Sequence, residues 1–384
     1  MEASEYREND GLALAHLLRD KKVTPADLME LAVALGERCD SEYNALCYVK
    51  PEEALSQARR AELKGQFGAL PFLLKDSGLA STYLLSSVGS RLFADMARFQ
   101  CHEMVKGGTR LVGAVRDESA AFEADPSIPI IDNFTDAVVT LGAEVAVFFD
   151  EPLRVKDRVI AAIDAGITTL VVLTEYVPVH DALEMRNAAI SRGANLIGPN
   201  SSGVLAAGRS KAGYFSDEIC APGDVGIITK GGSIAYGILS EMKRSGLGIS
   251  TIVSVGPDLV KGADYASLLP LFENDANTKR ILLLGEIGGH DEEAAAKVIV
   301  SQIRKPVVAY VCGKYVKEGQ VIGHAGAIIH DGVGDYQSKV LALMNAGVAV
   351  SEDFESVIPL LLGSLDAAGT TPEQIDNAET AGPA

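Results

Sequence analysis

Residues 224–246, DVGIITKGGSIAYGILSEMKRSG, contain the signals of a strand, a turn and a helix in immediate succession. The apolar run at 225–229 indicates a strand, and the two glycines that follow allow a tight turn. Apolar residues then recur at the spacing of an amphipathic helix. The N-terminus of this helix, at Gly232 and Ser233, offers unpaired backbone N–H groups to an anion.

The alternation of strand and helix signals continues on both sides of this stretch. Strand candidates upstream are RLVGAV, IPIID, VAVFF, TTLVVL and ANLIG, and those downstream are GISTIVSVG, TKRILLLGE, KPVVAYV and GVAVS. Helical stretches such as FTDAVVTLG separate them. Alternation at this spacing predicts parallel, doubly wound sheets in two α/β units. The polar, glycine-rich residues 206–224 are the expected hinge between the two units.

The two ends of the chain lack this alternation. Residues 1–65 are predicted to be mainly helical. Residues 366–384 have no apolar periodicity and are expected to be disordered. We therefore expect a helical N-terminal extension over 1–95, one α/β domain over 96–210 and a second α/β domain over 221–365.

The composition limits the function further. A net charge of -18 would repel a phosphate-rich surface, which argues against nucleic acid or an anionic membrane as a partner. The five cysteines are widely spaced and include no CxxC pair, so the sequence predicts neither a disulfide framework nor a zinc site. The acidic start has no signal-peptide pattern, and no apolar run is long enough to span a membrane. We expect a cytoplasmic protein with no metal site of its own.

A histidine stands between glycines in GHAGAII, residues 323–329. His324 therefore lies on a backbone that another group can approach closely. Upstream, LLLGEIGGHDEE places Glu286 at the end of an apolar strand, before a glycine turn and an acidic helix start. Together with the helix N-terminus at Gly232, these pieces suggest phosphate chemistry on a histidine. The simpler interpretation is a hydrogen-bonded core histidine and an ordinary acid at a helix start.

Seven segments of the chain resemble, in order, the alpha subunit of succinyl-CoA synthetase, one of the ligases that form acyl-CoA and a nucleoside diphosphate. The segments are GGTRLVGAV, AAIDAGITTLVVLTEYVP, LIGPNSSGV, PGDVGIITKGGSIAYG, LLLGEIGG, KPVVAYVCG and GHAGAII. The resemblance extends over about residues 99–365. It implies a CoA-binding Rossmann-like domain followed by a flavodoxin-like, doubly wound ligase domain.

The resemblance also implies a role for each residue of the phosphate site. His324 would become transiently phosphorylated, and Glu286 would hydrogen-bond its other ring nitrogen, fix the tautomer and stabilise the charged ring. Gly232 and Ser233 correspond to the helix N-terminus that receives the phosphoryl group. Tyr236 matches a tyrosine assigned to the carboxylate substrate, and a packing aromatic would suit its position in the helix equally well.

Substrates and a partner follow from the same resemblance. The CoA contacts that remain are Leu173, Thr174 and Glu175, at the carboxyl end of a predicted strand. The chain lacks the nucleotide-grasp fold, so an ATP-grasp beta subunit would have to supply ATP or GTP, Mg²⁺ and a second helix N-terminus in a hetero-oligomer. The remaining substrate would be a small carboxylate, whose identity, like the choice between ATP and GTP, does not follow from this sequence.

The region of the CoA site departs from the family pattern. The family's first strand and glycine-rich loop are missing, and Gly89 alone stands near their place. Ser119 takes the position of a CoA-contacting lysine, and Asp117 and Glu118 add negative charge beside a polyanionic cofactor. These changes predict weakened CoA binding. The alternative function is therefore a non-catalytic or regulatory alpha-like subunit whose CoA site has decayed.

Residues 1–95 resemble the opening segment of an amidase-signature hydrolase, through helices followed by NALCYV, PFLLKD and GSRLFAD. In that family the lysine that matches Lys75 is the base of a Ser-Ser-Lys triad. The glycine- and serine-rich nucleophile loop is not present in this sequence, and a base alone cannot hydrolyse an amide. We interpret residues 1–95 as an amidase-like stub and expect no amidase activity.

Overall fold

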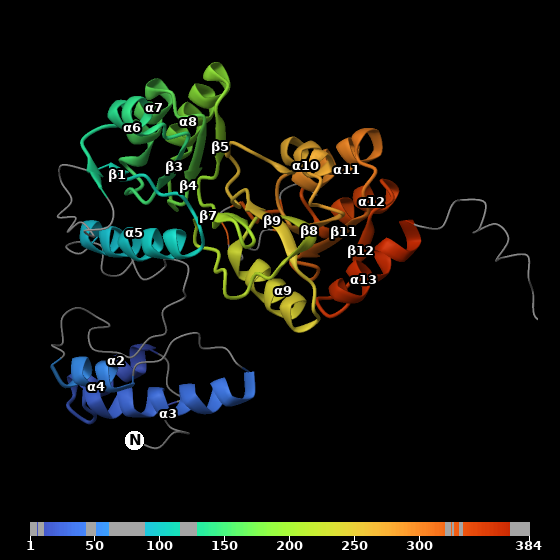
Figure 1. Ribbon diagram of the computed structural model, residues 1–384. Coiled ribbons are helices and arrows are strands. Elements are labelled where there is room, and N and C mark those ends of the chain that lie inside the picture. Colours follow the sequence, from blue (N-terminus) through green and yellow to red (C-terminus); the bar gives the residue numbers. More distant parts are fainter. Residues whose placement is uncertain are drawn as a thin grey trace, which may run out of the picture. The chain divides into compact units, whose positions relative to one another are not determined.

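The computed structural model of the chain contains two compact units, Met1–Ala80 and Ser81–Ala384 (Figure 1). The residues that the structure describes are 6, 11–43, 51–60, 89–115, 129–318, 324, 326–329 and 333–368. The first unit holds the helices α2 (Gly11–Arg19), α3 (Pro25–Tyr43) and α4 (Pro51–Arg60). Leu14, Leu18 and Leu28 form its small apolar cluster. The predicted helical character of the N-terminal extension is confirmed.

A seven-stranded sheet dominates the second unit, in the order β12-β11-β10-β8-β9-β6-β7. Its strands are β6 (Gly203–Ala206), β7 (Ser210–Gly213), β8 (Pro222–Thr229), β9 (Ile249–Ser254), β10 (Arg280–Glu286), β11 (Val307–Cys312) and β12 (Ala349–Ser351). Strands β8 to β12 pair in parallel, and β6 is antiparallel to both β7 and β9. Counted along the chain, the parallel strands follow the flavodoxin-like order 2-1-3-4-5.

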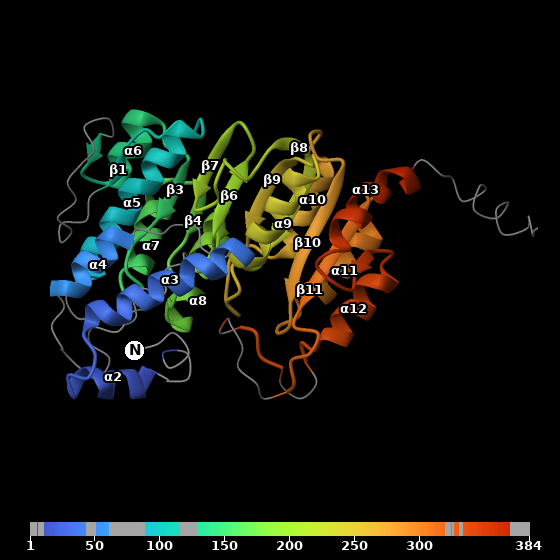
Figure 2. The ribbon, with the colours of Figure 1, turned by 90° about the horizontal axis from the view of Figure 1, so that it is seen from below.

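Helices cover both faces of this sheet (Figure 1, Figure 2). On one face pack α9 (Gly232–Arg244) and α13 (Val357–Ala368), and on the other α10 (Tyr265–Asn274), α11 (Asp291–Gln302) and α12 (Tyr336–Asn345). A strand with both faces covered is mostly apolar, and every residue of β10 except Glu286 is buried. Its first residue, Arg280, is charged and pairs with Asp224 at 3.0 Å. The prediction of a flavodoxin-like ligase domain is confirmed.

A smaller Rossmann-like layer precedes this domain, as the sequence predicts. Parallel strands β3 (Val145–Phe148), β4 (Thr169–Val172) and β5 (Asn195–Ile197) pack against α6 (Phe134–Leu141), α7 (Val155–Ala165) and α8 (Val179–Arg192). Strands β1 (Ala114–Val115) and β2 (Ile130–Ile131) form a separate parallel pair, and α5 (Gly89–Lys106) precedes β1. Asn133 begins α6 by accepting a hydrogen bond from the Asp136 amide, and Gly142 ends it at a φ of 65°.

The segment 206–224, expected to be a polar hinge, contains β7 and the start of β8. Strand β7 pairs with β6 and extends the large sheet. Its sequence, SKAG, carries no apolar alternation, and Lys211 is buried because its ammonium group donates to the Phe215 carbonyl at 2.9 Å. Of the positions discussed above, NALCYV, Lys75, residues 117–119 and the tail after Ala368 lie outside the described residues.

Candidate active site

The candidate site lies where β8 and β10 end at the middle of the large sheet. The chain leaves β8 toward β9 on one side, whereas β10 lies on the other side, so the strand order reverses here. Open α/β sheets bind their ligands in the crevice at such a switch point, beyond the carboxyl ends of the strands. Gly231 and Gly232 follow β8, and Glu286 is the last residue of β10.

His324 and Glu286 form a hydrogen-bonded pair. His324 Nδ1 lies 2.9 Å from Glu286 Oε2, and the two side chains are 32% and 15% exposed. An ionised carboxylate only accepts hydrogen bonds, so Nδ1 carries the proton and Nε2 carries the lone pair. The carboxylate also favours a positive charge that develops on the ring. The pair thus has the geometry of an oriented nucleophilic imidazole.

Close backbone contacts fix the segment that carries His324. A Cβ at Gly326 would lie 2.1 Å from the Pro257 carbonyl oxygen, and a Cβ at Gly288 would lie 2.0 Å from the Gly326 carbonyl oxygen. Gly288 also has a φ of 88°, which disfavours any side chain. These glycines allow the histidine segment to lie directly against the turn that follows β10.

The imidazole lies against the N-terminus of α9. A Cβ at Gly231 would be 2.8 Å from His324 Cε1 and 3.5 Å from Nε2. Gly231 is the N-cap residue and has no side chain to cap the helix, so the first amide groups of α9 remain directed toward this region. The helix dipole and these N–H groups favour negative charge beside His324. Gly232 and Ser233 occupy the first positions of α9.

Two residues near this helix end were not singled out from the sequence. A Cβ at Gly232 would lie 2.5 Å from Ser202 Oγ, so this hydroxyl adjoins the anion-binding end of α9. Asp258 accepts a hydrogen bond from Asn200 at 2.9 Å, and burial raises the pKa of its carboxyl. Both residues belong to loops after strands, and polar loop residues carry no periodic signal that would distinguish them.

Tyr236 packs one turn into α9. Its hydroxyl donates to the Tyr214 carbonyl at 2.8 Å, and its ring centroid lies 5.8 Å from that of Phe215. These contacts fit a packing aromatic. Its assignment to a carboxylate substrate stays a prediction.

Leu173, Thr174 and Glu175 follow β4 in the Rossmann-like layer. The Leu173 side chain is buried, and the Thr174 hydroxyl donates to the Asp150 carbonyl at 2.8 Å. Of these three side chains, only that of Glu175 is partly exposed. A ligand at this strand end would therefore meet mainly backbone groups and the Glu175 carboxylate.

A buried ion pair lies directly behind the site. Lys230 Nζ is 2.9 Å from Glu292 Oε1 and 3.3 Å from the Gly288 carbonyl, and Glu292 accepts a hydrogen bond from the Glu286 amide at 3.2 Å. Burial alone would lower the pKa of Lys230, but the carboxylates of Glu292 and Asp291 outweigh it and raise this pKa. Lys230 therefore keeps its charge, and the pair ties the end of β8 to the turn that carries Glu286.

Two further lysines complete this cluster. Lys339 is fully buried. Its ammonium group forms a hydrogen-bonded ion pair with Glu292 and donates to the Gly289 carbonyl at 3.0 Å. Lys261 Nζ lies 2.8 Å from Asp291 Oδ2. Burial would raise the pKa of Asp291, but Lys261 and Lys230 hold it below its ordinary value. This cluster could not be predicted from the sequence, because isolated lysines and a DEE run at a helix start are usually solvated.

Among the described residues, His180, Asp181 and Glu184 on α8 stand close enough to share a metal ion. Lys156 Nζ already lies 3.1 Å from a carboxylate oxygen of each acid, so an ammonium group compensates their charge. In the described part of the chain, no helix combines the length and the apolar character that a membrane crossing requires.

Comparisons with known proteins agree with this architecture. A family model described as CoA-ligase matches residues 228–349. The chain is 40% identical over 255 residues to a succinate–CoA ligase [ADP-forming] subunit alpha 2 of Archaeoglobus fulgidus. The matched region covers 66% of this chain and 88% of that protein. It is 34% identical to an ADP-forming sulfoacetate-CoA ligase subunit of Bilophila wadsworthia, over 68% of this chain and 91% of that protein. The chain therefore belongs to the family of succinate–CoA ligase alpha subunits.

Solved structures show the same fold. The ATP citrate lyase of Methanothrix soehngenii, in complex with citrate and coenzyme A, matches 67% of this chain with a TM-score of 0.59 at 23% identity. An acetyl-coenzyme A synthetase of Ca. Korarchaeum cryptofilum, in complex with phosphate and ADP, matches 67% with a TM-score of 0.54 at 21% identity. The chain spans about half of these longer proteins, 47% and 55% respectively.

Proposed function

We propose that this chain is the alpha subunit of an ADP- or GDP-forming acyl-CoA ligase that uses His324 as a transient phosphoryl carrier. The observation that carries the proposal is the imidazole of His324, held by Glu286 at 2.9 Å and lying against the N-terminus of α9. A core histidine would have no need of an uncapped helix end at its ring. Membership of the family supports an acyl-CoA ligase in general.

In the proposed reaction, the lone pair of His324 Nε2 forms a bond to the phosphorus, and the bond from phosphorus to its leaving oxygen breaks. Glu286 stabilises the positive ring that results. Backbone N–H groups of Gly232 and Ser233 stabilise the phosphoryl oxygens. The phosphoryl group then passes from His324 to the carboxylate, and the thiol of CoA attacks the acyl phosphate that forms. The C–O bond to the phosphate breaks, and inorganic phosphate leaves as the thioester forms.

The other components come from outside this chain. We propose an ATP-grasp beta subunit that holds ATP or GTP with Mg²⁺, because no nucleotide-grasp pattern occurs in this sequence. The complex would be cytoplasmic and would act on a small carboxylate. Relatives named for succinate and for sulfoacetate make both acids candidates. Tyr236 would contact the acid, and the backbone at 173–175 would contact CoA.

The domain boundaries are part of the same proposal. Residues 96–210 would form the CoA-binding domain and 221–365 the ligase domain. The expected tail, 366–384, begins inside α13, which continues to Ala368, and the boundary expected at residue 95 falls inside α5. Residues 1–95 would be an amidase-like stub without hydrolytic activity of its own. A non-catalytic, regulatory subunit is the second candidate, favoured by the missing glycine-rich loop and by Ser119 in the place of a CoA-contacting lysine.

Activity of the purified complex tests the proposal. The chain with its copurifying partner should release ADP or GDP continuously only when CoA and a carboxylate are both present, beyond the single burst that accompanies phosphorylation of His324, and His324→Asn should abolish both the burst and the continuous release. Titration of CoA into the isolated chain separates the two candidates. Heat of binding or a melting shift on addition of CoA supports the ligase, whereas the absence of both supports the regulatory subunit.

A further inference from the structure

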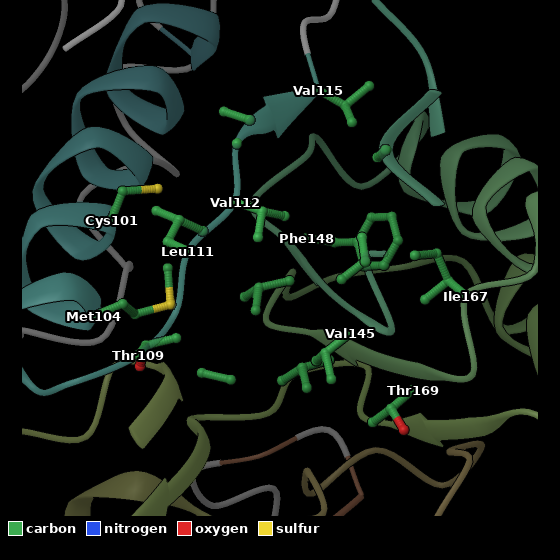
Figure 3. Close-up of a pocket in the computed structure, with 18 of the residues that line it drawn as sticks. Cys101, Met104, Thr109, Leu111, Val112, Val115, Val145, Phe148, Ile167 and Thr169 are labelled. Carbon is green, nitrogen blue, oxygen red and sulfur yellow. The ribbon is translucent and has the colours of Figure 1, made fainter. Parts of the chain in front are cut away.

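Figure 3 shows a cavity of about 650 Å³ in the Rossmann-like layer, with a mainly apolar lining that includes Leu111, Val145 and Phe148. Apolar walls leave the charge of a phosphoryl group unpaired, so this lining does not suit such a group. Hydrogen-bond donors gather instead at the N-terminus of α9, beside the large sheet. The hydroxyl of Ser202, which has no role in the reaction proposed above, lies at this helix end.

Two consecutive glycines at the start of α9 leave room for two side chains from other parts of the chain. A Cβ at Gly231 would lie 2.8 Å from His324 Cε1, and a Cβ at Gly232 would lie 2.5 Å from Ser202 Oγ. Consecutive Cα atoms are about 3.8 Å apart, so the imidazole and the hydroxyl occupy adjacent positions at the helix end. The space that each glycine leaves is therefore taken by a polar group from another element.

Backbone contacts on both sides hold Ser202 in place. The Tyr214 amide donates to the Ser202 carbonyl at 2.9 Å, and the Tyr236 hydroxyl donates to the Tyr214 carbonyl at 2.8 Å. The next residue, Gly203, has a φ of 100°, and its amide donates to Ser201 Oγ at 2.8 Å. A donor held in this way needs little rearrangement when negative charge develops beside it.

Among the described residues, the hydroxyl of Ser202 has no hydrogen-bond partner. Two neighbouring hydroxyl groups do have partners: that of Ser201 donates to the Ser254 carbonyl at 2.6 Å, and that of Thr229 donates to the Gly231 carbonyl at 2.7 Å. The Ser202 side chain is half-buried, so a ligand at the helix end can reach it. A charged oxygen there would accept a hydrogen bond from the hydroxyl, and such bonds are stronger than those between neutral groups.

We propose that Ser202 is a further catalytic residue, whose hydroxyl donates a hydrogen bond to an oxygen of the phosphoryl group on His324. The inference rests on the proposed function, because it requires a phosphoryl group at the N-terminus of α9. The imidazole binds the phosphorus from the side of Gly231, and the hydroxyl binds an oxygen from the side of Gly232. The backbone N–H groups of the helix end bind the other oxygens. Contacts on both sides orient the phosphoryl group for transfer to the carboxylate.

The rate of His324 phosphorylation tests this role, measured by quenched flow on the full-length chain with its copurifying partner and Mg-ATP. Ser202→Ala should lower the rate by about 10- to 100-fold, because it removes one hydrogen bond to a charged group. Ser202→Thr keeps the hydroxyl and should restore most of the rate. Ser191→Ala, which removes an exposed hydroxyl on α8, is the matched control and should leave the rate unchanged.

The outcomes separate this inference from the proposed function. A natural chain that is phosphorylated on His324 and a Ser202→Ala variant of equal rate would overturn the inference alone. A natural chain that is never phosphorylated would refute the inference together with the proposed function. A defect confined to the KM of the carboxylate would assign the hydroxyl to the acid substrate and overturn its role toward the phosphoryl group.

A binding measurement covers the case in which the methyl group of Ser202→Thr does not fit. Inorganic phosphate is titrated into the complex of the full-length chain and its partner without nucleotide. Ser202→Ala should weaken phosphate binding by about 10-fold, with an unchanged melting temperature. Equal affinities in the natural and variant complexes, or no phosphate binding to the natural complex, would contradict the inference. A fall in melting temperature with unchanged phosphate affinity would show a packing role instead.

Discussion

At the scale of single residues, the candidate site combines an accessible pair with a buried one. His324 and Glu286 are partly exposed and stand where a phosphate group can approach, whereas Lys230 and Glu292 are buried behind them. The buried pair holds the backbone on either side of Glu286 through the Glu286 amide and the Gly288 carbonyl. The accessible pair performs the chemistry in our proposal, and the buried pair keeps it in place.

Glu286→Gln should lower the rate of His324 phosphorylation by about 10- to 100-fold, because the amide keeps the size of the side chain but not the charge that stabilises the ring. The melting temperature should change little. Quenched-flow measurement of phosphoenzyme gives the rate. Glu241→Gln, on the exposed end of α9, is the control. Equal rates in the two variants would show that Glu286 has no role in the phosphorylation.

Glu292→Gln should destabilise the protein by about 3–5 kcal/mol, because it removes the nearest carboxylate from the buried Lys230 and Lys339 and leaves them only Asp291 and Glu293 at 3.4 Å and 3.3 Å. Urea unfolding measures the free energy. Glu352→Gln removes an exposed partner of Lys314 and should cost less than about 1 kcal/mol. Similar values for the two variants would mean that the buried cluster adds no more than a surface pair.

The acid dependence of stability should report on Asp291. The pKa of this carboxyl is below 3.8 in the folded protein, so as pH falls the unfolded chain binds a proton at Asp291 first. Its stabilising effect is thus complete above about pH 3.8 and is lost as pH falls through the lower folded value. The difference in unfolding free energy between the natural chain and Asp291→Asn should be constant near neutrality and shrink in this acid range. A difference that does not depend on pH would contradict the assignment.

The residues of the accessible pair could be named from the sequence, because a histidine between glycines and a carboxylate at a strand end form a recognisable pattern. The buried cluster could not. Lys230, Lys339 and Glu292 lie far apart in the chain and look like solvated charges, and only folding brings them within hydrogen-bond distance. Ser202 could not be predicted either, because it lies in a loop, where polar residues carry no periodic signal.

At the scale of elements, the end of α9 determines what the site can bind. The helix begins without a side-chain cap, so its first amides depend on water or a ligand. The ring of His324 lies beside this end, because a Cβ added at Gly231 would be 2.8 Å from His324 Cε1. The glycine is therefore a geometric requirement for the observed position of the ring.

Gly231→Ala should displace the imidazole from the helix end, because its Cβ would lie 2.8 Å from His324 Cε1. We expect about 10-fold slower phosphorylation or more, since a small misplacement of a reacting group is costly. Gly363→Ala on α13, where a Cβ meets nothing within 4 Å, is the control and should not change the rate. An unchanged rate for Gly231→Ala would mean that the ring does not act from this position.

The elements themselves were predictable where their pattern is strong. Buried parallel strands such as β10 are apolar runs, and each is followed by a helical period, so the doubly wound sheet followed from alternation. Strand β7 lies in the segment 206–224 that was expected to be a hinge, because SKAG is short and polar. Its place in the sheet comes from pairing with β6, which no local signal encodes.

At the scale of the whole molecule, the second unit contains both a ligase-type sheet and a Rossmann-like layer. The candidate phosphate site belongs to the ligase-type sheet, and the expected CoA contacts at 173–175 belong to the Rossmann-like layer. Our account therefore requires a phosphoryl group to form at His324 before CoA takes part. A partner subunit must deliver that group, so the isolated chain should not phosphorylate itself with Mg-ATP.

The most direct test is a search for an acid-labile phosphate on His324 by mass spectrometry under alkaline conditions. The chain should be purified with its natural partner and incubated with Mg-ATP. We predict a phosphate on His324 that disappears on addition of the carboxylate and CoA and never forms in His324→Asn. An unmodified His324 after incubation with the partner and Mg-ATP would contradict the phosphoryl-carrier account and favour the regulatory subunit.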